Sequence, residues 1–249
     1  METALFSPSS LFADSDGNST DEEFTDSSHQ DFVERKHQFP GMELLVREFY
    51  FHELNANLLW PGTFAFAEWL VEHRSWLEGR RTLELGSGTG ALAIFLHKSF
   101  KLDITTSDYD DKAIEENIAH NCQANGISPA LPHLKHTWGD SFPISNPHWD
   151  LIIASDILLY VKQYPNLIKT LTFLLRAYTP EVADSEPRDC QQHGLVSALP
   201  RPAFLMSWRR RIGKEDELLF FSGCEEAGLE VNHLGSRVYC IKPKERRDE

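Results

Sequence analysis

An α/β fold with a doubly wound, mostly parallel sheet is predicted by two observations on this chain of 249 residues. First, short apolar runs alternate with segments of helical length from residue 80 to residue 227. Such β–α alternation produces parallel strands that are covered by helices on both faces. Second, the run 151–154 is continuously apolar, as expected for a central strand that is buried on both sides.

The elements of this fold are expected in a simple order along the chain. We predict strands over 80–85, 102–107, about 133–138, 150–155 and 202–208, and helices over 89–99, 110–125, 162–177 and 214–227. Asp110 and Asp111 suit the positive end of the second helix. Two further β-like runs over 229–242 are interrupted at Gly235 and Ser236, which predicts a closing antiparallel hairpin and seven strands in total.

The N-terminal part of the chain differs in composition from the rest. Residues 1–40 contain nine Asp or Glu and two Lys or Arg, and they are rich in Ser and Thr. Such a composition cannot offset its ordering entropy, so residues 1–38 are predicted to be a disordered acidic tail.

A strand or hairpin is expected over residues 44–52, followed by a helix that begins at Trp60-Pro61-Gly62, since Pro favours the first helical turn. We therefore divide the remaining chain into an N-terminal extension over 39–75 and a main domain over 76–245. Residues 178–200 are expected to form a long surface insertion.

Composition excludes several classes of function. The net charge of −14 argues against nucleic-acid binding by phosphate neutralisation. The basic run 209–211 is interpreted as a solvated strand end. Four dispersed cysteines argue against a disulfide framework, and His133 and His136 lack a third metal ligand nearby. No apolar run suits a signal peptide or membrane span, so we expect a cytoplasmic protein that also enters the nucleus.

The octet Leu83–Gly90 reads Leu-Glu-Leu-Gly-Ser-Gly-Thr-Gly and joins the first predicted strand of the sheet to its first helix. Glycines at such a junction let the backbone approach a flat or anionic ligand without interference from Cβ atoms. A nucleotide-like cofactor is therefore predicted at the carboxyl edge of the sheet.

Two cofactors suit this loop, because residues 86–91 also match the loose dinucleotide fingerprint Gly-x-Gly-x-x-Gly/Ala. Glu84 lies two residues before the first glycine, where it would repel a pyrophosphate but attract an ammonium or sulfonium group. Asp108 ends the next strand, 22 residues after Gly86, and can accept hydrogen bonds from both ribose hydroxyls. A ribose beside a cation describes S-adenosylmethionine, which we favour over NAD.

Five short motifs in this order resemble those of methyltransferase family 16, a group of seven-β-strand, class I protein-lysine methyltransferases with a Rossmann-like sheet. They are Leu58-Leu59-Trp60-Pro61, Glu84–Gly90, Thr106-Ser107-Asp108, Trp138-Gly139-Asp140 and the segment Asp156-Ile157-Leu158-Leu159-Tyr160, in which Asp and Tyr are four residues apart. The resemblance covers roughly residues 40–245. It implies S-adenosylmethionine as cofactor and no metal.

The resemblance also implies roles for individual residues. It assigns contact with the cofactor to Trp60, Gly86, Ser87, Gly88, Asp108, Trp138 and Ser155, beside Glu84. Trp138 would cover the adenine, and Asp140 would support its loop. Asp156 would hold and orient the acceptor amine, and Tyr160 would line the acceptor pocket.

The expected reaction is methylation of a lysine side chain in a protein substrate by a monomeric enzyme. An arginine or small-molecule N-methyltransferase stays open, since one fold serves many acceptors. A NAD-dependent oxidoreductase and a non-catalytic scaffold are the remaining alternatives. Asn117 and Asn121, one helical turn apart, are expected to serve helix packing or the capping of a loop.

Overall fold

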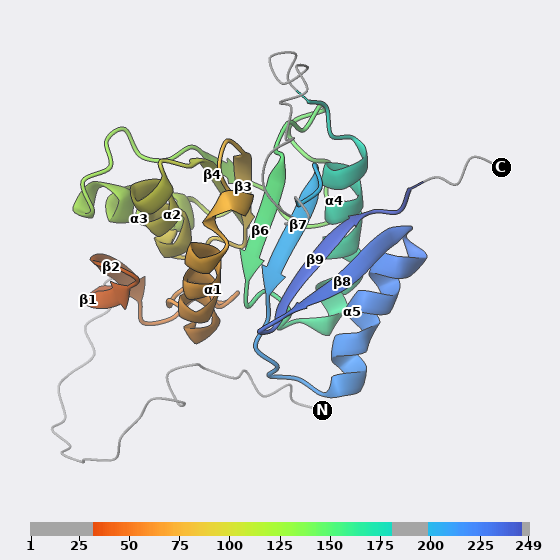
Figure 1. The fold of residues 1–249 in the computed structure, drawn as a ribbon. Coiled ribbons are helices and arrows are strands. Elements are labelled where there is room, and N and C mark those ends of the chain that lie inside the picture. Colours follow the sequence, from red (N-terminus) through yellow and green to blue (C-terminus); the bar gives the residue numbers. More distant parts are fainter. Residues whose placement is uncertain (1–31, 181–198, 246–249) are drawn as a thin grey trace, which may run out of the picture.

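The computed structural model describes residues 32–180 and 199–245, so the predicted tail up to residue 31 and the core of the predicted insertion lie outside it. A seven-stranded sheet forms the centre of the molecule, in the order β5-β4-β3-β6-β7-β9-β8 (Figure 1). Its strands are β3 (Arg81–Leu85), β4 (Asp103–Asp108), β5 (His133–Lys135), β6 (Leu151–Ser155), β7 (Ala203–Ser207), β8 (Leu229–Gly235) and β9 (Val238–Pro243).

The first five of these strands are parallel, and β9 pairs antiparallel with both β7 and β8. The predicted doubly wound sheet and its C-terminal hairpin are therefore confirmed. Strand β5 is shorter than predicted, because its pairing with β4 ends at Lys135.

Helices cover both faces of the sheet (Figure 1). One face carries α1 (Pro61–Glu72), α2 (Ala91–Phe100) and α3 (Lys112–Ala124), and the other carries α4 (Tyr164–Arg176) and α5 (Lys214–Glu226). Two short 3-10 helices, η2 (Arg74–Trp76) and η3 (Val161–Gln163), complete the order. Successive residues of β6 enter different cores: Ile153 packs on the α1–α2 side, and Ile152 packs on the α4–α5 side. Both faces of the central strand are thus buried, as its apolar run predicted.

An antiparallel hairpin precedes the sheet and consists of β1 (Phe32–Phe39) and β2 (Met42–Phe49). The prediction of a disordered tail over 1–38 is therefore wrong for residues 32–38. The physical reason is that β1 exposes most of its side chains, so its polar composition hides the strand. The buried side chains of the hairpin belong mainly to β2, among them Leu44 and Val46.

Asn117 and Asn121 on α3 and Asn125 at its C-terminal end hydrogen-bond to the edge of β2 that β1 does not pair with. Asn121 accepts a hydrogen bond from the Arg47 N–H at 2.7 Å and donates to the Arg47 carbonyl at 3.1 Å. Asn125 does the same with Leu45, at 3.1 and 2.7 Å. A side-chain amide has the donor and acceptor of a backbone amide, so these residues pair like a neighbouring strand. The packing role predicted for Asn117 and Asn121 is confirmed.

The described residues contain neither a membrane-spanning helix nor a disulfide bond between cysteines. No helix within 32–180 and 199–245 is long and apolar enough to cross a membrane. The three described cysteines, Cys122, Cys224 and Cys240, are buried free thiols.

Replacing Asn121 by Ala should lower the free energy of unfolding by about 1–3 kcal/mol, because it strands buried backbone groups of β2 and the loop carbonyl of Thr89. Denaturant titration followed by circular dichroism measures this change. Gln123→Ala on the exposed face of the same helix is the control and should change stability by less than about 0.5 kcal/mol. Equal effects of the two substitutions would contradict the bracing role.

Candidate active site

The carboxyl ends of β3, β4 and β6 meet at one edge of the sheet. From β3 the chain proceeds to β4 and β5 on one side, and from β6 it proceeds to β7 on the other. The strand order therefore reverses between β3 and β6. In open α/β sheets a ligand crevice lies at such a reversal, outside the carboxyl ends of the strands.

The glycine loop 86–90 follows β3 at this edge. Gly86 and Gly88 have φ values of 65° and 52°, which L-residues with side chains rarely adopt. A Cβ atom on Gly86 would also lie 2.8 Å from Cγ2 of Ile157, the residue after Asp156. The loop thus lies directly against the segment after β6, and glycine makes that approach possible.

Ser87 fastens the loop to β4. Its backbone N–H donates to the Ser107 carbonyl at 3.1 Å, and its hydroxyl accepts from the Ser107 N–H at 3.1 Å. The hydroxyl also donates to the Glu84 carbonyl at 3.2 Å. The Ser87 side chain is therefore committed to the loop, which leaves only its backbone for the cofactor contact that the resemblance implied.

Asp108 ends β4 beside the same loop. Its carboxylate accepts hydrogen bonds from the backbone N–H groups of Gly88 and Tyr109, both at 2.7 Å. Burial raises the pKa of Asp108, although these two hydrogen bonds oppose the shift. Because a carboxylate offers about four acceptor positions, it keeps capacity for the two hydroxyls of a ribose.

Glu84 is buried at the end of β3, with 2% of its surface exposed. Burial raises the pKa of Glu84 to about 8, with a smaller contribution from the charge of Asp108, although interactions with the Ser87 side chain and the Ala93 backbone oppose the shift. Among the described residues its Oε2 atom finds no hydrogen-bond partner. A buried carboxylate oxygen without a hydrogen-bond partner is costly, so the site favours either a protonated Glu84 or a cationic ligand near Oε2.

Trp138 lies beside the glycine loop, and Ser155 ends β6 and contacts α1. Cζ2 of Trp138 lies 3.8 Å from the Cβ position that Gly86 lacks, so the indole is beside the glycine loop. The Ser155 hydroxyl lies 2.9 Å from the hydroxyl of Thr63 at the start of α1. Asp140 is exposed and bonds through its backbone to Thr137.

Asp156 follows β6 with a φ of 55°, and only 3% of its surface is exposed. Its Oδ2 accepts from the backbone N–H of Gly62 and from Nη2 of Arg211, both at 2.8 Å. Its Oδ1 accepts from the backbone N–H of Arg209 at 3.1 Å. A Cβ atom on Gly62 would lie 2.6 Å from Oδ1, so this approach requires glycine.

The interpretation of residues 209–211 as a solvated strand end is therefore wrong for Arg211. Arg209 and Arg210 are exposed, but Arg211 turns inward to Asp156 and is 19% exposed at its side chain. The pattern of three consecutive arginines carried no signal for this difference, because their side chains diverge only where the chain turns after β7.

Tyr160 and Trp60 belong to the same cluster. The Asn55 side-chain amide donates to the Tyr160 hydroxyl, and the Trp60 indole N–H donates to the Asn55 carbonyl at 3.1 Å. The guanidinium carbon of Arg211 lies 4.3 Å from the centroid of the Trp60 ring. Burial raises the pKa of Tyr160, so its hydroxyl keeps its proton near neutral pH. Asn55, which the sequence did not mark, joins the two aromatic residues.

Two histidines outside this cluster are structural. His133 bonds through Nδ1 to the hydroxyl of Thr106, and His136 bonds through Nε2 to that of Thr170, at 2.9 and 3.2 Å. Burial lowers the pKa of both, which keeps them neutral. Within the described ranges no three potential metal ligands gather in one place.

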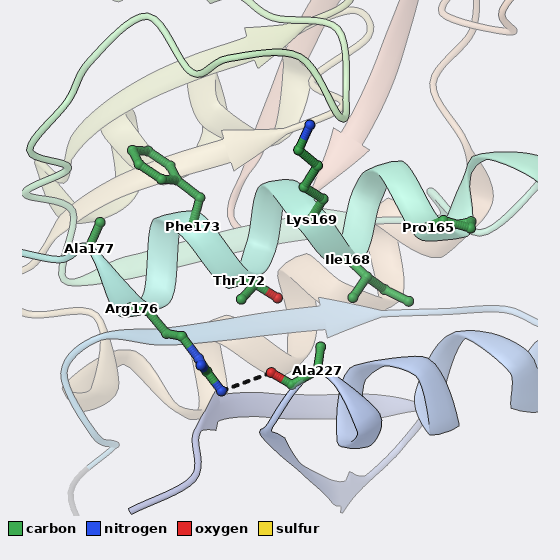
Figure 2. Close-up of a pocket in the computed structure, with 8 residues that line it drawn as sticks. All are labelled: Pro165, Ile168, Lys169, Thr172, Phe173, Arg176, Ala177 and Ala227. Atoms are coloured by element: carbon green, nitrogen blue, oxygen red, sulfur yellow. Dashed lines mark hydrogen bonds between the residues drawn. The ribbon is translucent and has the colours of Figure 1, made fainter.

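A shallow groove lies on the outer face of α4 and reaches the end of α5 (Figure 2). Ile168, Thr172 and Phe173 line it, and Arg176 donates to the Ala227 carbonyl at 2.8 Å across it. The groove contains no carboxylate and none of the predicted site residues. We therefore place the candidate site at the sheet edge instead.

The model of a protein family described as lysine methyltransferase matches residues 40–199. This chain belongs to that family. The motif-based resemblance to methyltransferase family 16 is thereby confirmed, and S-adenosylmethionine is confirmed over NAD as the cofactor.

Curated relatives differ in the acceptor that their names give. The protein N-terminal and lysine N-methyltransferase efm7 of Aspergillus fumigatus is 28% identical over 57% of this chain and 60% of its own length. The EEF1A lysine methyltransferase 3 of Xenopus tropicalis is 27% identical over 75% of each chain. The histone-arginine methyltransferase METTL23 of Xenopus laevis is 29% identical over 47% of this chain and 50% of its own. The match thus spans only half to three quarters of these relatives.

Solved structures share the fold at low sequence identity. A 16S rRNA methyltransferase of T. thermophilus superposes with a TM-score of 0.55 at 14% identity, over 86% of this chain and 51% of that one. The CcbJ methyltransferase of Streptomyces caelestis gives 0.52 at 12% identity, over 76% and 92%. These similarities establish the class I methyltransferase fold and nothing narrower.

The residues at the sheet edge fit S-adenosylmethionine. The buried carboxylate of Glu84, which lacks a partner for Oε2, suits the ammonium or sulfonium group of the cofactor. Asp108 has acceptor capacity for the ribose, and the indole of Trp138 lies beside the glycine loop.

The affinity for S-adenosylmethionine should rise between pH 6 and pH 8, by up to about tenfold per pH unit, the limit for one released proton. In the free protein Glu84 is protonated below its pKa of about 8, whereas a cationic partner requires the carboxylate. The raised pKa also means that the contribution of Glu84 to folding stability is complete below its ordinary pKa and is lost as the pH rises through about 8. Calorimetric titration at several pH values measures the affinity.

Glu84→Gln should remove this pH dependence, and the exposed Glu78→Gln should retain it. A wild-type affinity that does not change between pH 6 and pH 8 would show that Glu84 is not ionised by the bound cofactor.

Proposed function

We propose that this protein transfers the methyl group of S-adenosylmethionine to the side-chain nitrogen of a lysine in a protein substrate. The observation that most supports this reaction is the position of Asp156, a buried carboxylate that follows β6 directly before Ile157, the residue that lies against the glycine loop. Family membership supports the lysine acceptor. The names of the efm7 and EEF1A relatives support a protein substrate.

The cofactor supplies an electrophilic methyl carbon on a positively charged sulfur, and the protein supplies placement and electrostatics. In the transfer a C–N bond forms from the lone pair of the amine while the C–S bond breaks, and that electron pair goes to sulfur. The proton that the nitrogen then carries in excess is lost to water. The amine must therefore be neutral before the transfer, although a free lysine has a pKa of about 10.4.

Asp156 binds and orients the acceptor nitrogen. Its Oδ1 accepts one backbone hydrogen bond, so it has a lone pair left for an N–H of the acceptor. Tyr160 stands four residues later and is 38% exposed, so its ring is accessible to a substrate side chain. Its hydroxyl accepts from Asn55 and keeps its own proton for donation to the substrate.

Arginine is the second candidate acceptor, because the METTL23 relative named as a histone-arginine methyltransferase is about as similar as those named for lysine. The two acceptors are separated by incubating the purified protein with tritiated cofactor and a cell lysate, followed by hydrolysis and amino-acid analysis. We expect the label in methyl-lysine. A label in methyl-arginine alone would support the second candidate, and no labelled protein at all would contradict both.

Asp156→Asn should lower the rate of transfer by at least about 100-fold, because the acceptor loses its charged orienting group. Asn keeps the shape of the side chain and tolerates the left-handed backbone at this position. Cofactor affinity, measured by calorimetry, should change less than about threefold. Asp103→Asn, at the exposed start of β4, is the control and should leave the rate unchanged. A loss of cofactor affinity as the main effect would contradict the assignment.

A further inference from the structure

Arg211 has no role in the reaction as described so far, yet it makes the closest side-chain contact with the proposed acceptor carboxylate. Its Nη2 donates to Oδ2 of Asp156 at 2.8 Å, and the carboxylate side chain is fully buried. Its guanidinium lies on the ring of Trp60, 4.3 Å from the centroid. Two independent contacts thus fix this cation between the acceptor carboxylate and an aromatic residue of the N-terminal segment.

The contacts of Arg211 leave Asp156 free to bind a ligand. The ion pair and the Gly62 N–H both use Oδ2, whereas within 32–180 and 199–245 Oδ1 accepts only the Arg209 N–H. The open lone pair therefore lies on the oxygen that Arg211 does not occupy. Because the Asp156 side chain is fully buried, an acceptor nitrogen reaches Oδ1 only when a group that covers the carboxylate moves aside, but the contact of Arg211 with Oδ2 need not break.

The ion pair between Asp156 and Arg211 changes the electrostatic potential at the place where the acceptor amine binds. A lone carboxylate within 4–6 Å favours the ammonium form and raises the pKa of an amine by about 1–3 units. That is the wrong direction for a nucleophile. A guanidinium bound to the carboxylate cancels most of this field, and arginine stays protonated at all relevant pH values.

Neighbouring groups do not restore the negative charge. The start of α1 contributes the uncharged Gly62, the segment after β6 contributes Tyr160 in its protonated form, and the segment after β7 contributes Arg209 besides Arg211. Arg209 is exposed and adds positive charge. The carboxylate of Asp156 therefore lies among neutral and cationic groups.

A second observation points to a ligand at this place. Nη1 of Arg211 is buried and lacks a hydrogen-bond partner among the residues that the structure describes. A buried donor without an acceptor costs about 1–3 kcal/mol. An oxygen of the bound substrate or cofactor would satisfy it.

We propose that Arg211 is a positioning residue that neutralises Asp156, so that the acceptor nitrogen binds as a free amine instead of an ammonium ion. This inference rests on the proposed transfer to a nitrogen nucleophile. In this mechanism the ion pair between Arg211 and Asp156 favours the neutral, reactive form of the acceptor amine.

The test compares two probes of the acceptor site, n-butylamine and the permanently charged n-butyltrimethylammonium. Both are titrated by calorimetry or NMR into the protein saturated with S-adenosylhomocysteine. Arg211→Gln should bind the permanent cation at least about tenfold more tightly than the wild type, which corresponds to one pKa unit of restored field. Arg211→Lys keeps the cation and should behave like the wild type, and Arg210→Gln on the exposed side is the matched control. Circular dichroism checks the folding of each variant.

A second test measures the rate of methyl transfer at several pH values, with a protein labelled in the lysate experiment as the substrate. The pH at which kcat reaches half of its plateau should rise by about 1–2 units in Arg211→Gln and stay in place in Arg211→Lys, because kcat reports the pKa of groups in the enzyme–substrate complex. A uniform loss of rate at every pH would mean that Arg211 is only structural and would overturn the proposal. Equal affinity of wild type and Arg211→Gln for the permanent cation, or no binding to either, would also overturn it. If the proposed methyl transfer is wrong, the wild-type protein labels no protein in the lysate experiment, and this outcome is distinct from the results with the Arg211 variants.

Discussion

The buried ion pair between Asp156 and Arg211 joins three segments that are far apart in the sequence. Asp156 follows β6, Arg211 follows β7, and Gly62 begins α1. Removing water from two charges costs several kcal/mol per ion, and their attraction repays this only where further hydrogen bonds complete the geometry. Here two backbone N–H groups complete it. The acceptor side of the site therefore depends on all three segments being in place at once.

The cofactor side depends on a different constraint, the close approach of backbone segments at the glycine loop. Gly86 lies against the segment after β6, Ser87 is fastened to β4, and Asp108 accepts the Gly88 N–H. These contacts bring the carboxyl ends of three strands to one point. The position of Glu84 beneath the loop follows from this arrangement, and burial there alters its protonation.

The N-terminal hairpin is separate from the central sheet, but it contacts α3 and leads into the segment that reaches Tyr160 and Arg211. Asparagines of α3 take the edge of β2 in place of another strand. The loop after β2 then brings Asn55 and Trp60 to Tyr160 and Arg211. A bracing contact on one face of the molecule thus determines where an aromatic residue of the site lies.

The alternation of strands and helices, the glycine loop with Glu84 and Asp108, and the Asp156–Tyr160 motif could be read from the sequence, because each depends on residues close together along the chain. Strand β1 could not, since a strand with mostly exposed polar side chains carries no periodic apolar signal. The inward turn of Arg211 and the link through Asn55 could not be read either, because their partners Asp156 and Tyr160 lie 55 and 105 residues away along the chain. Local pattern determined the fold and the cofactor loop. Only the tertiary structure decided the charge around Asp156, because electrostatic fields depend on distance in space and not on separation in sequence.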